Sequence, residues 1–128
     1  MKVLLDTHAW LWFVLGDPQL STPARAAIED PINEKLISPA SYWEISIKIS
    51  LGKYLLPEPY TSFMTRAIGG QGFTILPIEP RHTELVCKLP WHHRDPFDRL
   101  LIAQTLVESL VLLSNDDRLD AYGMQRIW

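Results

Sequence analysis

The chain has 128 residues, of which 47% are hydrophobic and 21% charged, and its net charge is −3. This composition is typical of a globular protein and excludes a disordered chain. The negative net charge excludes a protein that binds nucleic acid through an overall positive charge. The length suits one hydrophobic core, so we expect a single domain spanning residues 1–128.

Membrane insertion and secretion are not expected. No apolar stretch approaches the ~20 residues that are needed to span a bilayer, and Asp6 interrupts the first apolar run too early for a signal peptide. The single cysteine, Cys87, cannot form an intramolecular disulfide or a cysteine metal site. We therefore expect a cytoplasmic protein that has no membrane partner.

Strands and helices are predicted to alternate in the first half of the chain. Thr22 followed by Pro23 is typical of a helix N-cap and a first helical residue, and Pro31 stops this helix. Ser38 and Pro39 repeat the signal for the next helix. The expected elements are strands at 2–5 and 35–37 and helices at 7–15, from 22 to the proline at 31, from 39 to about 50, and at 60–68.

The best-defined helix of the second half begins at Asp95-Pro96-Phe97-Asp98 and runs to about Glu108. Asp95 is its predicted N-cap and Pro96 its first helical residue. The remaining expected elements are strands at 73–78 and 111–113, a helix at 82–89, a helical turn at 118–121 and an edge strand at 125–127. This alternation predicts an α/β fold with three layers, α/β/α, around a central, mainly parallel sheet.

Four acidic residues lie at the points where apolar runs end or begin. Asp6 and Asp116 follow predicted strands, Glu44 lies one turn into the helix after the second strand, and Asp98 opens the last long helix. Segments beyond the carboxyl ends of parallel strands line one crevice, where four carboxylates repel one another unless cations neutralise them. Oxygen ligands of this kind suit Mg²⁺ or Mn²⁺. We expect a metal site there and chemistry on phosphate.

Each of these acids also has a purely structural explanation. Asp6 is in position to cap the following helix, and Glu44 is in position to pair with Lys48 one turn on. Asp98 lies in a first helical turn, where the helix dipole stabilises carboxylates. Asp116 belongs to a Ser-Asn-Asp-Asp turn. The metal site is therefore predicted from the joint placement of four acids and not from any one of them.

Four blocks of sequence carry these acids: VLLDTH at 3–8, SYWEISIK at 41–48 with LGK at 51–53, DPFDRLLIAQ at 95–104 and LSND at 113–116. In this order and spacing they resemble the PIN-domain family and, within it, the VapC-type toxins of bacterial toxin–antitoxin modules. The resemblance covers roughly residues 1–122.

The resemblance implies a metal-dependent ribonuclease with a central parallel sheet. It also implies a homodimer and a small antitoxin protein that occludes the active site. Asp6, Glu44 and Asp98 match the first three acids of the family, and Asp116 matches the fourth and most variable one. The neighbouring Asp117 leaves open which of the two supplies the fourth acid.

The expected reaction is hydrolysis of phosphodiester bonds in RNA. One or two Mg²⁺ or Mn²⁺ ions would activate water and stabilise the charge that develops on the phosphate. We expect the hydroxyls of Thr7 and Ser114 to orient the groups of the site; the family often has threonine in place of Ser114. Lys48, Arg94 and Arg99 are candidates for phosphate contacts, and Arg99 is equally suited to pair with a carboxylate.

Other classes of protein fit the sequence less well. A phosphatase that forms a phospho-aspartate, an alternative Mg²⁺-dependent phosphotransfer enzyme, typically has a second acid two residues after the first, where this chain has His8. A receiver domain needs an acidic pair after its first strand and a lysine after its last, and neither is evident. A non-catalytic PIN-like binding module would be expected to lack one of the acids, and none is missing. The ribonuclease is therefore the favoured hypothesis.

Overall fold

The computed structural model describes all residues from Met1 to Trp128. Its centre is a five-stranded sheet with the strand order β3-β2-β1-β4-β5, and all four neighbouring pairs are parallel. The predicted parallel sheet is therefore confirmed. The strands are β1 (Lys2–Leu5), β2 (Glu34–Ile37), β3 (Thr74–Ile75), β4 (Val111–Leu113) and β5 (Gln125–Ile127).

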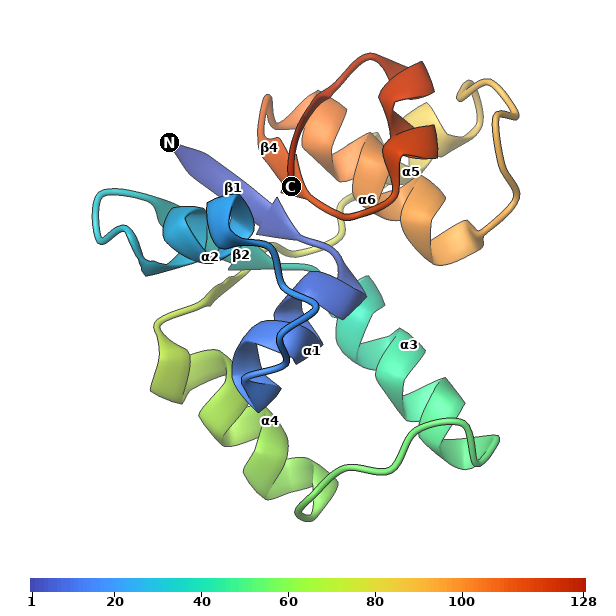
Figure 1. The fold of residues 1–128 in the computed structure, drawn as a ribbon. Coiled ribbons are helices and arrows are strands. Elements are labelled where there is room, and N and C mark those ends of the chain that lie inside the picture. Colours follow the sequence, from blue (N-terminus) through green and yellow to red (C-terminus); the bar gives the residue numbers. More distant parts are fainter.

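Helices cover both faces of this sheet, with α1 and α4 on one side and α5 and α6 on the other (Figure 1). None of them combines the length and the apolar composition that crossing a lipid bilayer requires. The helices are α1 (Thr7–Leu15), α2 (Thr22–Glu29), α3 (Pro39–Ser50), α4 (Tyr60–Ile68), α5 (Pro80–Val86) and α6 (Pro96–Val107), and the 3₁₀ helices are η1 (Gly69–Gln71) and η2 (Asp117–Tyr122).

Alternation along the strands separates two hydrophobic clusters. Val3 and Leu5 of β1 belong to the cluster that includes Trp10 of α1, whereas Leu4 belongs to the cluster that includes Leu101 of α6. Successive side chains of a strand point to opposite faces, so a run of apolar residues in β1 fills both clusters. The result is the predicted three-layer α/β/α arrangement.

The site is positioned by a reversal in strand order at the centre of the sheet. From β1 the chain adds β2 and β3 on one side and β4 and β5 on the other, which makes the β1/β4 boundary the place where ligands bind in open parallel sheets. The Asp6 backbone N–H donates to the Leu113 carbonyl at 3.0 Å. The segments that follow β1 and β4 therefore lie side by side, so that Asp6 and Asp116 can contribute to one site.

Several predicted boundaries were wrong. Ser21, not Thr22, caps α2, because the Ser21 hydroxyl accepts from the Ala24 N–H. The strand predicted at 73–78 is limited to Thr74–Ile75. The helix predicted at 82–89 runs from Pro80 to Val86 instead. It begins two residues earlier because the His82 side chain accepts from the backbone N–H of Glu79 and completes a capping box there.

Candidate metal centre

A cavity of about 440 Å³ opens where the segments after β1 and β4 meet α3 and the first turn of α6. Its lining contains no hydrophobic residue. All four predicted acids line it, which confirms that the fold brings them together, and so do Thr7 and Lys48. The lining residues are Asp6, Thr7, His8, Glu44, Lys48, Asp95, Asp98, Asn115, Asp116 and Arg118.

Asp6 serves both the helix and the cavity. One carboxylate oxygen caps α1 by accepting from the Ala9 N–H at 2.7 Å, as its structural explanation predicted. Burial raises the pKa of Asp6, and hydrogen bonds from Ser114 and Ala9 offset only part of that rise. Ser114 is itself fully buried, and its hydroxyl oxygen accepts from the Asp116 N–H at 3.2 Å. The ionised form of Asp6 therefore needs further positive charge.

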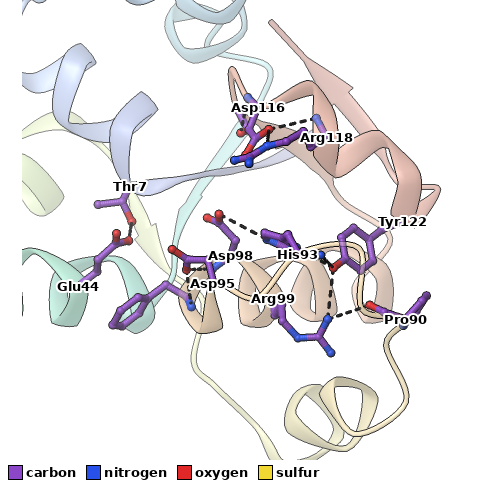
Figure 2. A network of polar contacts seen from close by, with 12 residues as sticks. Thr7, Glu44, Pro90, His93, Asp95, Asp98, Arg99, Asp116, Arg118 and Tyr122 are labelled. Carbon is purple, nitrogen blue, oxygen red and sulfur yellow. Dashed lines mark hydrogen bonds and ion pairs between the residues drawn. The ribbon is translucent and has the colours of Figure 1, made fainter.

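Glu44 is held by partners on both of its oxygens. Oε1 accepts from the Thr7 hydroxyl at 2.6 Å (Figure 2), and Oε2 accepts from Lys48 Nζ at 2.8 Å. The side chain is buried. Thr7 thus orients Glu44 rather than the adjacent Asp6, and Lys48 supplies the helical ion pair that the sequence predicted.

Asp98 is the carboxylate that the neighbouring acids perturb most clearly. Asp95 caps α6 by accepting from the N–H groups of Phe97 and Asp98, which frees the Asp98 carboxylate from capping. Burial, followed by the negative charges of Asp95, Asp6, Glu44 and Asp116, raises the pKa of Asp98 to about 7. Asp98 is therefore a carboxylate that ionises fully at neutral pH only when a cation approaches.

Asp116, and not Asp117, faces the cavity. Its two oxygens accept from the Arg118 guanidinium at 2.9 and 2.7 Å, and this hydrogen bonding lowers the pKa of Asp116. Asp116 also caps η2. Asp117 is exposed and lies outside the cavity lining, so Asp116 is the better candidate for the fourth acid.

The two predicted arginines, Arg94 and Arg99, do not line the cavity. Arg99 is buried with 2% of its surface exposed, and its guanidinium donates to the backbone carbonyls of Pro90, Leu89 and Val86. This placement puts Arg99 outside the acidic cavity and favours a structural role with backbone carbonyls as partners instead of a carboxylate. Arg94 is exposed and lies in a separate groove.

Four residues of the cavity lining were not among the predicted site residues. Arg118 reaches back to the acid two residues before it, and Asn115 immediately precedes that acid. His8 belongs to the first turn that Asp6 caps, and Asp95 was predicted only as a cap. Their adjacency to the predicted acids was the available signal. Their side-chain directions depend on the packing of α1, α6 and η2.

The donor set of the cavity consists of oxygen atoms, which suits a hard divalent cation. No three of its acidic and histidine side chains bring ligand atoms within 4.8 Å of one another. Mg²⁺ tolerates such spacing, because it usually keeps several waters and binds through one or two carboxylates. The residues present therefore fit Mg²⁺ or Mn²⁺ with partial protein ligation.

A second cluster, at the α5–α6 contact, does meet that spacing and consists of Glu79, His82 and Glu108. His82 Nδ1 accepts from the Glu79 N–H at 3.0 Å, so the ring proton sits on Nε2, which lies 2.9 Å from Glu108 Oε1. Arg81 also donates to Glu108. A metal on Nε2 would require a proton on Nδ1 and would break the helix cap. This cluster is accordingly a structural hydrogen-bond network.

Comparison with known proteins identifies the family. The family model described as PIN domain matches residues 3–124, almost the whole chain. The chain belongs to the PIN domain family. The four acid-bearing blocks lie within the matched region, so the PIN domain resemblance inferred from the sequence is confirmed.

Among curated proteins, the chain is similar to Ribonuclease VapC16 of Mycobacterium tuberculosis (strain ATCC 25618 / H37Rv). The two are 37% identical over 70 residues, which cover 52% of this chain and 50% of the relative. The match thus spans about half the length of the curated relative. This similarity agrees with the VapC-type resemblance inferred from the sequence.

Solved structures show the same fold. The structure of VapBC2 from Rickettsia felis bound to a promoter DNA fragment matches with a TM-score of 0.74 at 15% identity, covering 99% of this chain and 98% of that chain. VapBC-1 from nontypeable Haemophilus influenzae matches with a TM-score of 0.69 at 16% identity, covering 99% and 97%. At these identities the likeness establishes the PIN fold over nearly the full chain.

Proposed function

We propose that this protein is a Mg²⁺- or Mn²⁺-dependent endoribonuclease that hydrolyses phosphodiester bonds in RNA. One observation carries the proposal: carboxylates from four separate segments line one cavity that has no hydrophobic residue in its lining. Burial, followed by the negative charges of the neighbouring acids, raises the pKa of Asp98 to about 7. A divalent cation would relieve the repulsion between these carboxylates, which the fold holds close together.

Asp6, Glu44, Asp98 and Asp116 would hold the metal and are the proposed catalytic residues. The bound cation would activate water and neutralise the charge developing on the phosphate. Thr7 orients Glu44 through its hydrogen bond, and Ser114 would orient Asp6. Some of the four carboxylates would bind the ion through a water molecule instead of directly, because their oxygens are widely spaced.

Cationic side chains at the cavity would bind the phosphate backbone. Lys48 pairs with Glu44 and Arg118 pairs with Asp116, and each would exchange part of that contact for a phosphate once metal neutralises the acid. Arg94 is exposed on a neighbouring groove and would bind a more distant phosphate. Arg99 has no part in substrate binding under this proposal.

We further propose that the protein is a single PIN domain acting in the cytoplasm as the toxin of a toxin–antitoxin pair. The support is its similarity to Ribonuclease VapC16 and to the VapBC2 and VapBC-1 structures. Homodimerisation and inhibition by a cognate antitoxin protein follow from the same resemblance. Copurification with the product of an adjacent short reading frame, and loss of activity in that complex, would test the partner.

Incubation of purified protein with cellular RNA tests the activity. Cleavage is expected with Mg²⁺ or Mn²⁺ and not with chelator. Asp98→Asn should abolish it, and Asp116→Asn should reduce it. Asp117→Asn is the matched control, because this neighbouring acid is exposed and outside the cavity. Loss of activity in all three variants alike would contradict the assigned site.

The alternative is a PIN-like module that binds RNA without cutting it. Well-folded, antitoxin-free protein that binds Mn²⁺ and RNA but leaves a broad RNA pool intact would favour that alternative. Transfer of a phosphoryl group to Asp6, detected by mass spectrometry, would instead indicate a phosphotransfer enzyme.

A further inference from the structure

The Tyr122 hydroxyl determines where the proton of the His93 ring lies. This oxygen accepts from Arg99 Nη1 at 3.3 Å and from the His93 backbone N–H at 3.2 Å, and it lies 2.7 Å from His93 Nδ1. A hydroxyl has two acceptor lone pairs and one proton. With both lone pairs engaged by N–H groups, Tyr122 donates its proton to Nδ1. His93 is therefore neutral, with its own proton on Nε2.

That Nε2–H points toward the acidic cavity. Nε2 lies 3.5 Å from Asp98 Oδ2, with the ring placed between Tyr122 and Asp98 (Figure 2). Only 9% of the His93 side chain is exposed, and Nε2 is buried without a hydrogen-bond partner. A separation of 3.5 Å is too long for a hydrogen bond. Contacts of this kind often tighten when an active site is loaded.

The support behind the ring is rigid. Arg99 holds Tyr122 while donating to the carbonyls of Leu89 and Pro90, and its guanidinium stacks 3.8 Å from the centre of the Trp91 ring. These contacts tie the segment before α6 to α6 itself and to η2. The buried Nε2–H on this support faces the Asp98 carboxylate and has no other hydrogen-bond partner.

We propose that His93 is a positioning residue whose Nε2–H, set by Tyr122, orients the Asp98 carboxylate for the divalent cation. This proposal rests on the proposed metal-dependent function. With the cation bound, the Nε2–H would donate to Oδ2, and the other Asp98 oxygen would remain available to the cation. Hydrogen bonds to ligating carboxylates of this kind are typically worth 10–100-fold in metal affinity or activity.

The tautomer is tested directly on metal-free protein. Long-range ¹H–¹⁵N spectra of histidine-labelled protein at a pH where the ring is neutral should show His93 protonated on Nε2. In Tyr122→Phe the Nδ1 donor is lost, so the two tautomers should become mixed. A His93 ring protonated on Nδ1 in the unsubstituted protein would overturn the proposal. This readout does not depend on nuclease activity.

Calorimetric titration with Mn²⁺ tests the consequence. His93→Leu removes the N–H donor and should weaken Mn²⁺ binding roughly tenfold, whereas His93→Gln keeps an N–H and should recover most of the affinity. His92→Leu is the matched control, because His92 also packs edge-on against Tyr122 but is exposed and has no contact with Asp98. Melting curves establish whether each variant is folded. If His93→Leu is not folded, Tyr122→Phe replaces it and is likewise expected to weaken Mn²⁺ binding.

The results separate this proposal from the proposed function. Protein that binds Mn²⁺ and cleaves RNA equally well with and without the His93 side chain would overturn the positioning role and leave the ribonuclease intact. Unsubstituted protein that neither binds Mn²⁺ nor cleaves RNA would overturn both. Equal weakening by His92→Leu and His93→Leu would show general loosening of the loop and would also overturn the positioning role.

Discussion

The hydroxyl of Thr7 donates a hydrogen bond of 2.6 Å to Oε1 of Glu44, a residue 37 positions further along the chain. The bond is buried and joins the first residue of α1 to the second turn of α3. Lys48 engages the other oxygen, so the Glu44 carboxylate has a defined orientation before any ligand arrives. Two helices that begin at different strands are thus coupled at the edge of the acidic cavity.

Removal of this hydroxyl should affect both stability and activity. Thr7→Val is nearly isosteric and leaves a buried carboxylate oxygen without its donor, which costs about 1–3 kcal/mol. Urea unfolding should show that loss, and RNA cleavage should fall because Glu44 is no longer held. Thr7→Ser is the control, since it keeps the hydroxyl and should retain most of both properties. Equal behaviour of the two variants would contradict the assigned hydrogen bond.

Metal-free protein should lose stability as the pH rises from about 4 to about 7. The folded state raises the pKa of Asp98 to about 7, whereas the unfolded chain has an ordinary value near 3.9. In this window the folded state binds more protons, so its stability falls with rising pH, by about 1.4 kcal/mol for each unit of pKa difference. The raised pKa of Asp6 acts in the same sense. Urea unfolding in chelator at pH 5 and pH 8 measures the effect.

The opposite pH dependence is expected with metal present. Divalent cations bind ionised carboxylates, so Mn²⁺ should add more stability at pH 8 than at pH 5. Asp116, whose pKa Arg118 lowers, stays ionised throughout this range and contributes to neither trend. Stability that is independent of pH in chelator would indicate that Asp98 is ionised in the metal-free fold.

Asp98→Asn should stabilise the metal-free protein while abolishing RNA cleavage. The substitution removes a charge that Asp95, Asp6, Glu44 and Asp116 repel, and the cap of α6 remains because Asp95 supplies it. Thermal melts in chelator at pH 8 should therefore show a higher midpoint than for the unsubstituted protein. Addition of Mn²⁺ should stabilise the unsubstituted protein more than the variant. A lower midpoint in chelator would show that Asp98 contributes mainly to the helix.

Arg99→Met should destabilise the fold strongly. The guanidinium donates hydrogen bonds to the carbonyls of Pro90, Leu89 and Val86 and to the Tyr122 hydroxyl. Each buried group left without a partner costs about 1–3 kcal/mol, so we expect a loss on the order of 3 kcal/mol in urea unfolding.

The matched control for that arginine is Arg94→Gln. Arg94 is exposed, and surface substitutions usually change stability by less than about 0.5 kcal/mol. A similar loss of stability in both variants would contradict the structural role assigned to Arg99. A specific loss of RNA affinity in Arg94→Gln would support its proposed phosphate contact.

Local sequence signals were sufficient for most of the elements and for the positions of the acids. Proline at the first helical turn, preceded by Ser38 or Asp95, marks where α3 and α6 begin. Proline fixes its own backbone angle, and the capping side chain accepts from N–H groups only two or three residues further on, so both signals are local. Strand ends are visible as the end of an apolar run, so Asp6 and Asp116 could be placed at one edge once the sheet was taken as parallel. The errors at the starts of α2 and α5 arose because more than one nearby residue could have begun or capped each helix.

Tertiary structure decided which groups meet at that edge. The order of the strands places Asp6 beside Ser114, Thr7 reaches Glu44 through the packing of α1 against α3, and Arg99 turns toward backbone carbonyls instead of the cavity. A sequence specifies where polar groups lie along the chain, and their partners are determined by long-range burial, because an unpaired polar group in the interior is costly. The positions of the acids could therefore be predicted from the sequence, whereas the hydrogen bonds that orient them are determined by the tertiary structure.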